Sequence, residues 1–437
     1  MSVQIHHWDT LSPDLRVALL QRPALEVDAS IRTDVKGILS EVRQRGDAAL
    51  KEFTDRFDGV DLEAFEVTDA ELRQAETSLT DRQIGAIDTA IANVKLFHEQ
   101  QSAPTIDIET VAGVRCQRIS HAIDSVGLYV PAGSAPLPST ALMLAVPAVI
   151  AGCPERILCT PCQADGSADA GVLVAATHAG INRIFKLGGA QAIAAMAYGT
   201  ESVPKVEKIF GPGNAWVTAA KTEIASDPEC ASIDMPAGPS EVLVIADGSA
   251  SAEFVASDLL SQAEHGPDSQ TILLCTDKEF AIAVSNAISQ QSSNLSRRSI
   301  VSAALEYCRI IVVSALQDAV TISNQYAPEH LIVHTDAPRD ILPAVRNAGS
   351  VFLGPWSPES VGDYCSGTNH VLPTYGAARR YSGLGVDQFK RQMTVQELTR
   401  DGLLALAPTV LELASMEGLD AHANAVLLRV SDEVVDS

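Results

Sequence analysis

From residue 125 onward, short apolar runs alternate with glycine-bearing loops and with longer segments whose apolar residues recur at helical spacing. A first series of such runs lies within residues 125–210, and a second begins at residue 241 and ends near residue 353. Strands that alternate with helices of this length favour right-handed β-α-β units and a parallel sheet. The pattern therefore predicts two successive α/β domains.

The segments that flank these two series have a helical pattern. Residues 28 to about 103 carry apolar positions at helical spacing without strong strand signals, which indicates a packing layer rather than a site. A short helical pattern lies within the first 25 residues, and after Gly385 the pattern is helical to the end of the chain. This C-terminal tail is too short for a compact core of its own, so we expect it to pack on a neighbour or on another subunit.

Composition narrows the classes of function. The chain has 437 residues, of which 46% are hydrophobic and 20% charged, as in a soluble globular enzyme. Its net charge of −24 disfavours nucleic acid or an anionic membrane as partner, because both would be repelled. The longest apolar run, residues 141–151, covers about half of a membrane span. No basic region followed by an apolar stretch marks the N-terminus, so we expect a cytoplasmic protein without a secretory signal.

The eight cysteines have neither the spacing of a disulfide framework nor that of a complete zinc site. Cys159 and Cys162 form a single C-x-x-C at the end of a predicted strand, and structural, half-buried thiols are the favoured interpretation. Cys365 lies in a polar motif without a basic neighbour in sequence that would favour a reactive thiolate. We assign it no chemical role.

Three glycine-bearing loops follow predicted strands. In the loop 211–214 the backbone amides and the helix dipole favour an anionic group, although the G-x-G-x-x-G fingerprint is absent and a tight structural turn explains the loop equally well. The loops 188–191 and 129–133 lie at equivalent strand ends, and ligands of an open parallel sheet bind outside the carboxyl ends of its strands. The candidates for contact with a nucleotide are Tyr129, Gln191 and Asn214.

Gln262 and His265 lie three residues apart where a predicted helix runs out into Gly266 and Pro267. Positions i and i+3 share one face of a helix, so both side chains can reach a single point beyond its end. Asp363 and His422 lie in two further polar, glycine-bearing patches; the four together are Gln262, His265, Asp363 and His422. Two nitrogens and two oxygens suit Zn²⁺ and tolerate Mn²⁺ or Co²⁺, whereas each residue taken alone is better explained as an ordinary polar group.

Glu329 and His330 form the third chemical element. An adjacent carboxylate and imidazole can both accept protons near neutral pH, which is typical of an acid–base pair. A turn at a helix end with one solvated carboxylate explains the same residues, and the pattern alone leaves both interpretations open.

Several of these segments closely resemble histidinol dehydrogenase, and the resemblance runs in order from about residue 5 to residue 430. It is carried by the segments 210–217, 233–242, 261–270, 326–331, 362–374 and 417–426. Ala132 departs from the Val-Pro-Gly-Gly loop expected of the family, and its methyl group can alter nucleotide affinity because glycine permits a closer approach of the backbone.

The resemblance implies a homodimeric enzyme with one Zn²⁺ per subunit that oxidises L-histidinol to L-histidine with two NAD⁺, through bound L-histidinaldehyde, in the last two steps of histidine biosynthesis. The implied zinc ligands are Gln262, His265 and Asp363 from one subunit and His422 from the other. The implied acid–base pair is Glu329 and His330, and the NAD⁺ contacts are Tyr129, Gln191 and Asn214. The implied substrate contacts are Ser240, Gln262, His265, His330, Asp363, His370, Glu417 and His422, with Glu417 also donated across the dimer.

With this resemblance we expect an α/β fold of two Rossmann-like parallel-sheet domains with small helical extensions at both termini. The expected boundaries are 1–27 for the N-terminal extension, 28–128 plus 241–384 for a discontinuous first domain with the metal and acid–base residues, 129–240 for an inserted nucleotide-binding domain, and 385–437 for a helical tail that reaches the partner subunit.

Three other functions remain as alternatives. A relative that oxidises a different small polyol, such as a sulfonated diol, would use the same fold, but Glu417 suits a substrate ammonium rather than an anion. A zinc hydrolase would use Glu329 to activate water, and the three nucleotide-type loops disfavour it. A non-catalytic binding module is disfavoured because the acid–base and metal residues are all present.

Overall fold

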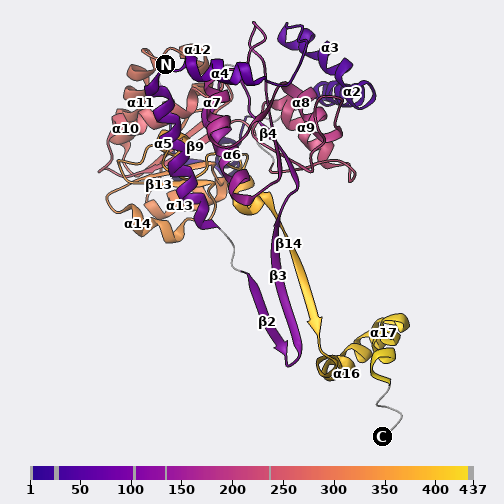
Figure 1. Cartoon of the computed structure of the whole chain (residues 1–437). Helices are drawn as coiled ribbons and strands as arrows, with labels where there is room; N and C mark the ends of the chain where they lie inside the picture. Colours follow the sequence, from indigo (N-terminus) through magenta and orange to yellow (C-terminus); the bar gives the residue numbers. More distant parts are fainter. Residues whose placement is uncertain (1–2, 24–28, 102–104, 133–134, 236–237, 432–437) are drawn as a thin grey trace. The chain divides into compact units, whose positions relative to one another are not determined.

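The structure is a computed structural model that describes residues 3–23, 29–101, 105–132, 135–235 and 238–431 (Figure 1). The chain forms two compact units. The larger unit comprises Met1–Gln101 with Ile123–Phe389, and the smaller comprises Ser102–Ala122 with Lys390–Ser437.

A six-stranded sheet, entirely parallel, forms the first core of the larger unit. Its strand order is β1 (Ile5–His7), β11 (Arg309–Val312), β10 (Gln270–Cys275), β9 (Glu241–Ala246), β12 (His330–His334) and β13 (Ser350–Leu353). Every residue of β9, β10 and β12 is buried, as expected where helices cover both faces of a parallel sheet.

Alternate residues of these strands belong to two different hydrophobic clusters, because successive side chains of a strand point to opposite faces. Val242 and Val244 pack with α10 (Ala252–Ala263), α11 (Lys278–Ser292) and α12 (Arg298–Ala304). Leu243 and Ile245 pack instead with α1 (Pro13–Leu19), α13 (Leu316–Tyr326) and α14 (Pro338–Ile341). The helices that pack on the two faces thus hold the sheet in place, and with it the ends of its strands.

A five-stranded parallel sheet forms the second core of the larger unit. Its strand order is β6 (Arg183–Lys186), β5 (Glu155–Thr160), β4 (Ser125–Tyr129), β7 (Lys208–Phe210) and β8 (Ser232–Ile233). Its helices are α6 (Pro138–Ala151), α7 (Ala170–His178), α8 (Gly189–Tyr198) and α9 (Ala215–Ala225). The predicted α/β class with two parallel sheets is confirmed.

The helical layer near the N-terminus packs on the helices of the five-stranded sheet. Helices α2 (Ala29–Arg45) and α3 (Asp47–Asp58) contact α8, whereas α4 (Asp69–Ser78) and α5 (Asp81–His98) contact α7. Capping boxes begin α4 at Thr68 and α5 at Thr80, which satisfies amides that a helix start otherwise leaves unpaired. The sheet itself begins at Ser125, slightly before the expected boundary at residue 129, and the expected domain division stays a prediction.

The smaller unit corrects the expectation of a purely helical tail after Gly385. Residues Lys390–Leu398 form strand β14, which pairs antiparallel with β3 (Val114–Ala122), and β3 pairs with β2 (Ile106–Val111). Most residues of β14 are exposed, so the strand lacks the apolar alternation that reveals a half-buried strand, and pairing with β3 overrides a sequence rich in helix formers. The helices α16 (Arg400–Glu417) and α17 (Asp420–Val430) complete the unit.

The remaining elements are α15 (Glu359–Tyr364) and short 3-10 turns at Trp8–Thr10, Glu99–Gln101, Leu305–Tyr307, Leu342–Ala344, Ala377–Arg379 and Val386–Phe389. Across the part of the chain that the structure describes, no helix combines the length and the apolar character that a bilayer crossing requires.

Candidate active site

The amino ends of the strands of the six-stranded sheet bring most of the predicted polar residues together. Ser240 directly precedes β9, and Glu329 directly precedes β12, whose first residue is His330. Strand β12 lies beside β9 in the sheet, with His330 opposite Val242. Because the strands are parallel, the segment between the end of α10 and the start of β10 reaches the same edge.

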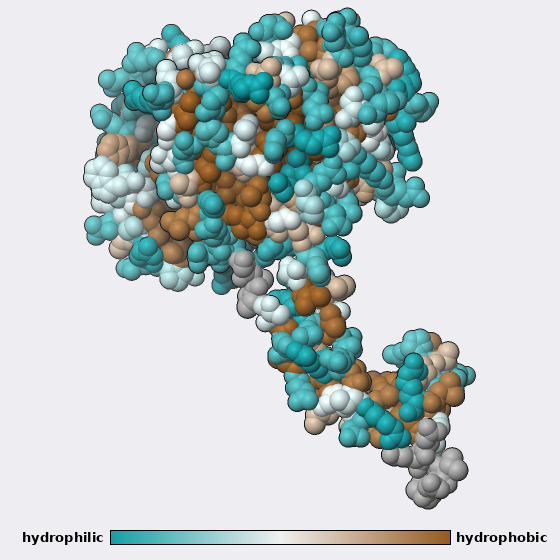
Figure 2. Space-filling view, in the orientation of Figure 1, coloured by the Kyte–Doolittle hydropathy of each residue, from teal (hydrophilic) through white to brown (hydrophobic). Residues whose placement is uncertain are grey.

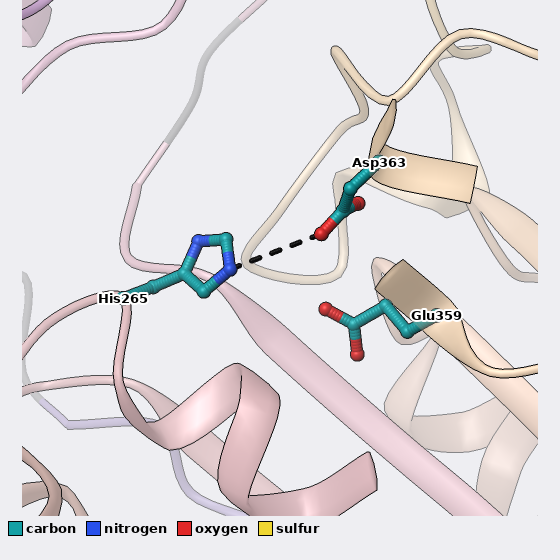
Figure 3. A group of neighbouring side chains, drawn as sticks. All are labelled: His265, Glu359 and Asp363. Atoms are coloured by element: carbon teal, nitrogen blue, oxygen red, sulfur yellow. Dashed lines mark ion pairs between the residues drawn. The ribbon is translucent and has the colours of Figure 1, made fainter. Parts of the chain in front are cut away.

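His265 and two carboxylates form a cluster with the geometry of a metal site (Figure 3). One ligand atom from each of His265, Glu359 and Asp363 lies within 4.8 Å of the others, and His265 Nε2 is 3.8 Å from Asp363 Oδ2. The two acids are four residues apart on α15 and therefore share a face of that helix. The His265 side chain is 45% exposed, so the cluster is open on its side.

Gln262 lies fully buried next to this cluster, in the last turn of α10. Its amide satisfies its neighbours when the nitrogen faces Glu359: it then donates to Glu359 Oε1 at 2.9 Å and to the carbonyl of Glu241 at 3.0 Å. This orientation leaves the amide oxygen for a different partner. The amide oxygen is the atom through which a glutamine binds a metal.

His330 is held as a neutral imidazole with one free nitrogen. Its Nδ1 lies 3.1 Å from the carbonyl oxygen of Glu241, so we assign the proton to Nδ1. Nε2 is buried, has no hydrogen-bond partner among the described residues and lies 3.6 Å from Asp363 Oδ1. Burial lowers the pKa of His330 to about 3. The ring therefore presents an unprotonated Nε2 to the site, as a general base requires.

Glu329 is buried beside this ring. Its Oε2 accepts a hydrogen bond from the Glu241 N–H at 2.9 Å and lies 3.6 Å from His330 Nδ1. Burial raises the pKa of Glu329 well above its usual range. The N–H and the C=O of one residue, Glu241, therefore orient both members of the predicted acid–base pair.

Four carboxyl groups gather here beside the imidazoles of His265 and His330: Asp258, Glu329, Glu359 and Asp363. Burial raises the pKa of each, to about 7 for Asp258 and Asp363. No lysine or arginine within the described ranges forms an ion pair with any of them. The carbonyl end of α10 adds a partial negative charge. Such a site disfavours anions and suits a cation, so the donor set fits a bound divalent metal.

His370 lies close enough to His265 for the two rings to influence each other's charge. Burial lowers the pKa of His370 to about 4, and its buried Nε2 has no hydrogen-bond partner in the part of the chain that the structure describes. Buried polar atoms are almost always paired, so the free Nε2 atoms of His330 and His370 both indicate a site built for a ligand.

The predicted nucleotide contacts lie at the carboxyl ends of the five-stranded sheet. Tyr129 ends β4 and its hydroxyl accepts the N–H of Gly189 at 3.0 Å, whereas Gln191 is buried in the first turn of α8. Asn214 caps α9, with its Oδ1 accepting the N–H groups of Trp216 and Val217 at 3.1 Å. The cap occupies the amide oxygen and leaves the amide nitrogen of Asn214 for other contacts.

A buried ion pair fixes the loop that begins at Gly211. The Gly211 N–H donates to Asp234 Oδ2 at 2.8 Å, and its carbonyl accepts from Lys221 Nζ at 2.7 Å. Lys221 and Asp234 also pair with each other at 2.5 Å. Gly211 has φ +122°, and a Cβ there would lie 2.1 Å from the carbonyl oxygen of Tyr129, so only glycine fits.

Glu417 and His422 belong to the smaller unit. Glu417 is the last residue of α16 and His422 lies in the first turn of α17, and both residues are exposed. Their predicted contacts stay predictions.

The pattern of the sequence did not reveal four residues of this site: Arg22, Glu241, Asp258 and Glu359. Glu359 carried a weak signal, because it precedes Asp363 by four residues in a segment that forms a helix. Arg22 and Glu241 carried none, since 219 residues separate them and only the fold brings them into contact.

The family model described as histidinol dehydrogenase matches residues 20–430 of this chain. The chain belongs to the histidinol dehydrogenase family. It is therefore an oxidoreductase, and the resemblance inferred from its motifs is confirmed.

Relatives of known name agree over almost the whole length. Histidinol dehydrogenase of Vibrio vulnificus is 53% identical over 423 residues, which cover 97% of each chain. That of Pectobacterium atrosepticum is 54% identical over 424 residues, covering 97% of this chain and 95% of the relative. The crystal structure of histidinol dehydrogenase from Elizabethkingia anophelis superimposes with a TM-score of 0.94 at 43% identity, covering 99% of this chain and 98% of that one.

Proposed function

We propose that this protein oxidises L-histidinol to L-histidine with two NAD⁺, through bound L-histidinaldehyde, and so catalyses the last two steps of histidine biosynthesis. Membership of the histidinol dehydrogenase family supports the reaction. The observation that carries the mechanism is the neutral His330: among the described residues its Nε2 has no hydrogen-bond partner, and it faces a cluster of acids that forms no ion pair with lysine or arginine there.

In this proposal Gln262, His265 and Asp363 hold one Zn²⁺ together with the partner subunit's His422. Two nitrogens and two oxygens are suitable donors for zinc, and the uncompensated acids favour a cation at this point. When bound, Zn²⁺ would anchor the imidazole and amine of the substrate and fix its carbinol for reaction. Glu359 would keep the Gln262 amide turned so that its oxygen faces the ion.

Protein groups account for the proton transfers. His330 Nε2 takes the alcohol proton while a hydride leaves the same carbon for NAD⁺, which gives the bound aldehyde. Glu329 then removes a proton from water as the oxygen attacks the aldehyde carbon, and the protonated His330 returns its proton to the former carbonyl oxygen, so that a gem-diol forms and His330 is again neutral. His330 takes a proton from this diol while the second hydride leaves for a second NAD⁺, which yields the carboxylic acid.

The remaining contacts orient the two ligands. Ser240 and His370 would contact the substrate from the same subunit, and the carboxylate of Glu417 from the partner would pair with the substrate ammonium. Tyr129, Gln191 and Asn214 would contact NAD⁺ at the carboxyl ends of the five-stranded sheet, where the helix N-termini favour its phosphates.

The exposed apolar side chains of the smaller unit support the proposed homodimer. Large apolar side chains of α16, α17 and the turn between them are exposed, and apolar surface appears on this unit in Figure 2. They are Leu413, Met416, Leu419, Leu427 and Leu428. Such a surface is typical of an interface, and Glu417 and His422 lie among these residues in the sequence.

One assay tests the proposed function. NADH absorbance is followed after addition of L-histidinol to the zinc-loaded enzyme, with and without a chelator. We expect two NADH per histidinol and loss of the reaction after chelation. One NADH per histidinol would refute the second oxidation, and turnover that survives complete removal of metal would refute the zinc requirement.

Mixing two inactive variants tests the shared site. Glu329→Gln and His422→Asn subunits are each expected to lack the overall reaction, but a mixed dimer retains one site with both native residues. Partial recovery of activity after mixing is expected. No recovery, with dimer exchange shown by mass spectrometry, would contradict a ligand donated across the dimer.

A further inference from the structure

Arg22 follows α1 and lies largely buried against the amino edge of the six-stranded sheet. Its Nε and Nη2 donate to the two carboxylate oxygens of Glu241 at 2.5 and 2.9 Å. The side chains are 15% and 2% exposed, and the guanidinium stacks 3.9 Å from the centre of the Tyr326 ring. Such a fork of two hydrogen bonds between a guanidinium and a carboxylate fixes the orientation of the two groups as well as the distance between them.

The same guanidinium holds a second segment of the chain. Arg22 Nη2 donates to the carbonyls of Tyr326 at 2.9 Å and Ala327 at 3.4 Å. Ala327 has φ +56°, a left-handed conformation that costs a non-glycine residue about 1 kcal/mol or more. This strained turn leads through Pro328 directly into Glu329, so Arg22 connects the first residue of β9 with the turn before the acid–base pair.

Glu241 transmits this contact to the site through its main chain. Its N–H donates to Glu329 Oε2 at 2.9 Å, and its carbonyl accepts from His330 Nδ1 at 3.1 Å. Its carboxylate also accepts the N–H of Tyr375 at 2.8 Å. The side chain of Glu241 is thus fixed on one side by Arg22, while its peptide groups orient the carboxylate of Glu329 and the tautomer of His330.

We propose that Arg22 and Glu241 are a positioning pair for the acid–base residues of the reaction. This inference rests on the proposed function and adds two residues that touch neither substrate nor cofactor. The pair fixes the start of β9 against the turn at Ala327, so that the Glu329 carboxylate and the His330 Nε2 are held in place. A buried ion pair contributes little net stability compared with an apolar pair, whereas it specifies geometry, so its main effect is on catalysis.

Four variants test the pair: Arg22→Lys, Arg22→Met, Glu241→Gln and the double variant Arg22→Met/Glu241→Gln. The double variant removes both charges of the pair and leaves neither one unpaired, so we expect its thermal midpoint to be closer to wild type than that of Arg22→Met. We expect kcat for histidinol to fall about 100-fold in it, as a small misplacement of catalytic groups can cause, with an unchanged KM for NAD⁺. Arg22→Lys keeps the charge but loses the fork, and should also lower kcat.

Arg16→Met is the matched control, because Arg16 also stacks on an aromatic ring, Trp8, and donates to a carbonyl at 3.1 Å, but lies away from β9. It should retain wild-type kcat. If the double variant recovered both stability and kcat, the pair would have only a structural role and the inference would be wrong. If the double variant fails to fold, Arg22→Lys decides: wild-type kcat in that variant would overturn the inference.

A spectroscopic measurement separates this inference from the proposed function. In protein labelled with ¹⁵N-histidine, the His330 signals are identified with His330→Asn and report which ring nitrogen carries the proton. We expect protonated Nδ1 in wild type and a mixture of tautomers in the double variant. Absence of NADH formation in wild type would refute the proposed function alone, whereas identical His330 signals in both proteins would overturn the positioning role.

Discussion

The two parallel sheets of the larger unit present their candidate ligand groups at opposite ends of their strands. In the five-stranded sheet Tyr129, Gln191 and Asn214 lie at the carboxyl ends, beside the first turns of α8 and α9. In the six-stranded sheet the acid–base and metal-type residues lie at the amino ends, beside the last turn of α10. Ligands of open parallel sheets usually bind at the carboxyl ends, so the second arrangement needs a physical reason.

The reason is the charge of the ligand that each edge suits. Helix N-termini offer free N–H groups and a partial positive charge, which favour phosphates. The amino edge of the six-stranded sheet offers the carbonyl end of α10 and four carboxyl groups, three of them buried and that of Asp363 half-buried, which favour a cation. The amino edge of the six-stranded sheet, with its four carboxyl groups, is the acidic edge, and it suits a metal ion and an amine-bearing substrate. The carboxyl edge of the five-stranded sheet, with the loop at Gly211, is the glycine-loop edge, and it suits a dinucleotide.

The largest effect is expected at His330. Replacement by Asn removes the imidazole whose Nδ1 lies 3.6 Å from Glu329 Oε2 and whose Nε2 lies 3.6 Å from Asp363 Oδ1. We expect kcat to fall about 10²- to 10⁴-fold for oxidation of histidinol and of histidinaldehyde alike. Steady-state kinetics with each substrate measure both, and KM for NAD⁺ should stay unchanged. A loss confined to one half-reaction would contradict a base shared by both steps.

Glu329→Gln should instead impair one half-reaction far more than the other. The amide can still accept the N–H of Glu241, so the fold of the site is preserved, but it cannot take a proton from water. We expect oxidation of the aldehyde to fall about 100-fold or more and oxidation of histidinol to fall far less. Single-turnover NADH formation with each substrate distinguishes them. Equal losses in both would remove the water-activating role from Glu329.

Glu359 should affect the metal rather than the proton transfers. Glu359→Leu removes the acceptor that turns the Gln262 amide, and we expect Zn²⁺ affinity to fall about 10- to 100-fold, measured by competition with a chromophoric chelator. Glu359→Gln keeps an acceptor and should lose less. Glu264→Gln, a change of the neighbouring acid at the end of α10, is the control. A loss as large as that of Asp363→Asn would instead make Glu359 a direct ligand.

The sequence predicted the two edges unequally well. The parallel sheets followed from alternating apolar runs and loops, because strands buried on both faces are continuous apolar segments. The pair Gln262 and His265 was visible because the two residues lie one helical turn apart. Strand β14 was missed because its exposed, polar residues carry no period-two signal.

The supporting residues escaped prediction for a different reason. Arg22 reaches Glu241 across 219 residues, and the carboxyl group of Asp258 becomes unusual only when burial raises its pKa to about 7. Neither contact distance nor burial is encoded in local spacing. Motifs can therefore identify groups that touch a ligand, whereas the groups that orient them emerge only from the fold.

At the glycine-loop edge, the double variant Lys221→Met/Asp234→Asn should weaken only nucleotide binding. It removes the buried pair that fixes Gly211 without leaving an unpaired charge. We expect KM for NAD⁺ to rise about tenfold, the equivalent of one charge-assisted hydrogen bond, with Zn²⁺ affinity unchanged. Lys205→Met, which loses an exposed contact to a carbonyl, is the control. A fall in Zn²⁺ affinity would show that the two edges are not independent.

The smallest effect is a dependence of stability on pH that is specific to the acidic edge. Burial raises the pKa of Asp258 and Asp363 from 3.8 to about 7, so between these values the folded protein holds more protons than the unfolded chain. Stability must then fall as pH rises from about 4 to 7, by at most about 1.4 kcal/mol per pH unit for each extra proton that the folded protein holds, and the fall ends above pH 7 once the proton is lost. His330 and His370 act oppositely, but only below their unfolded value of 6.5.

Thermal unfolding of metal-free protein between about pH 6.5 and 8 therefore reports on the acidic edge as a whole, because burial also raises the pKa of Glu329 and Glu359. We expect the midpoint to decrease over this range, to decrease less in Asp258→Asn, and to stop decreasing when Zn²⁺ is bound, because a cation stabilises the ionised carboxylates. NAD⁺ alone should leave the slope unchanged, since its expected contacts lie at the other sheet. A midpoint of the metal-free protein that rises with pH would mean that these acids are already ionised, and the acidic edge would then not depend on a cation.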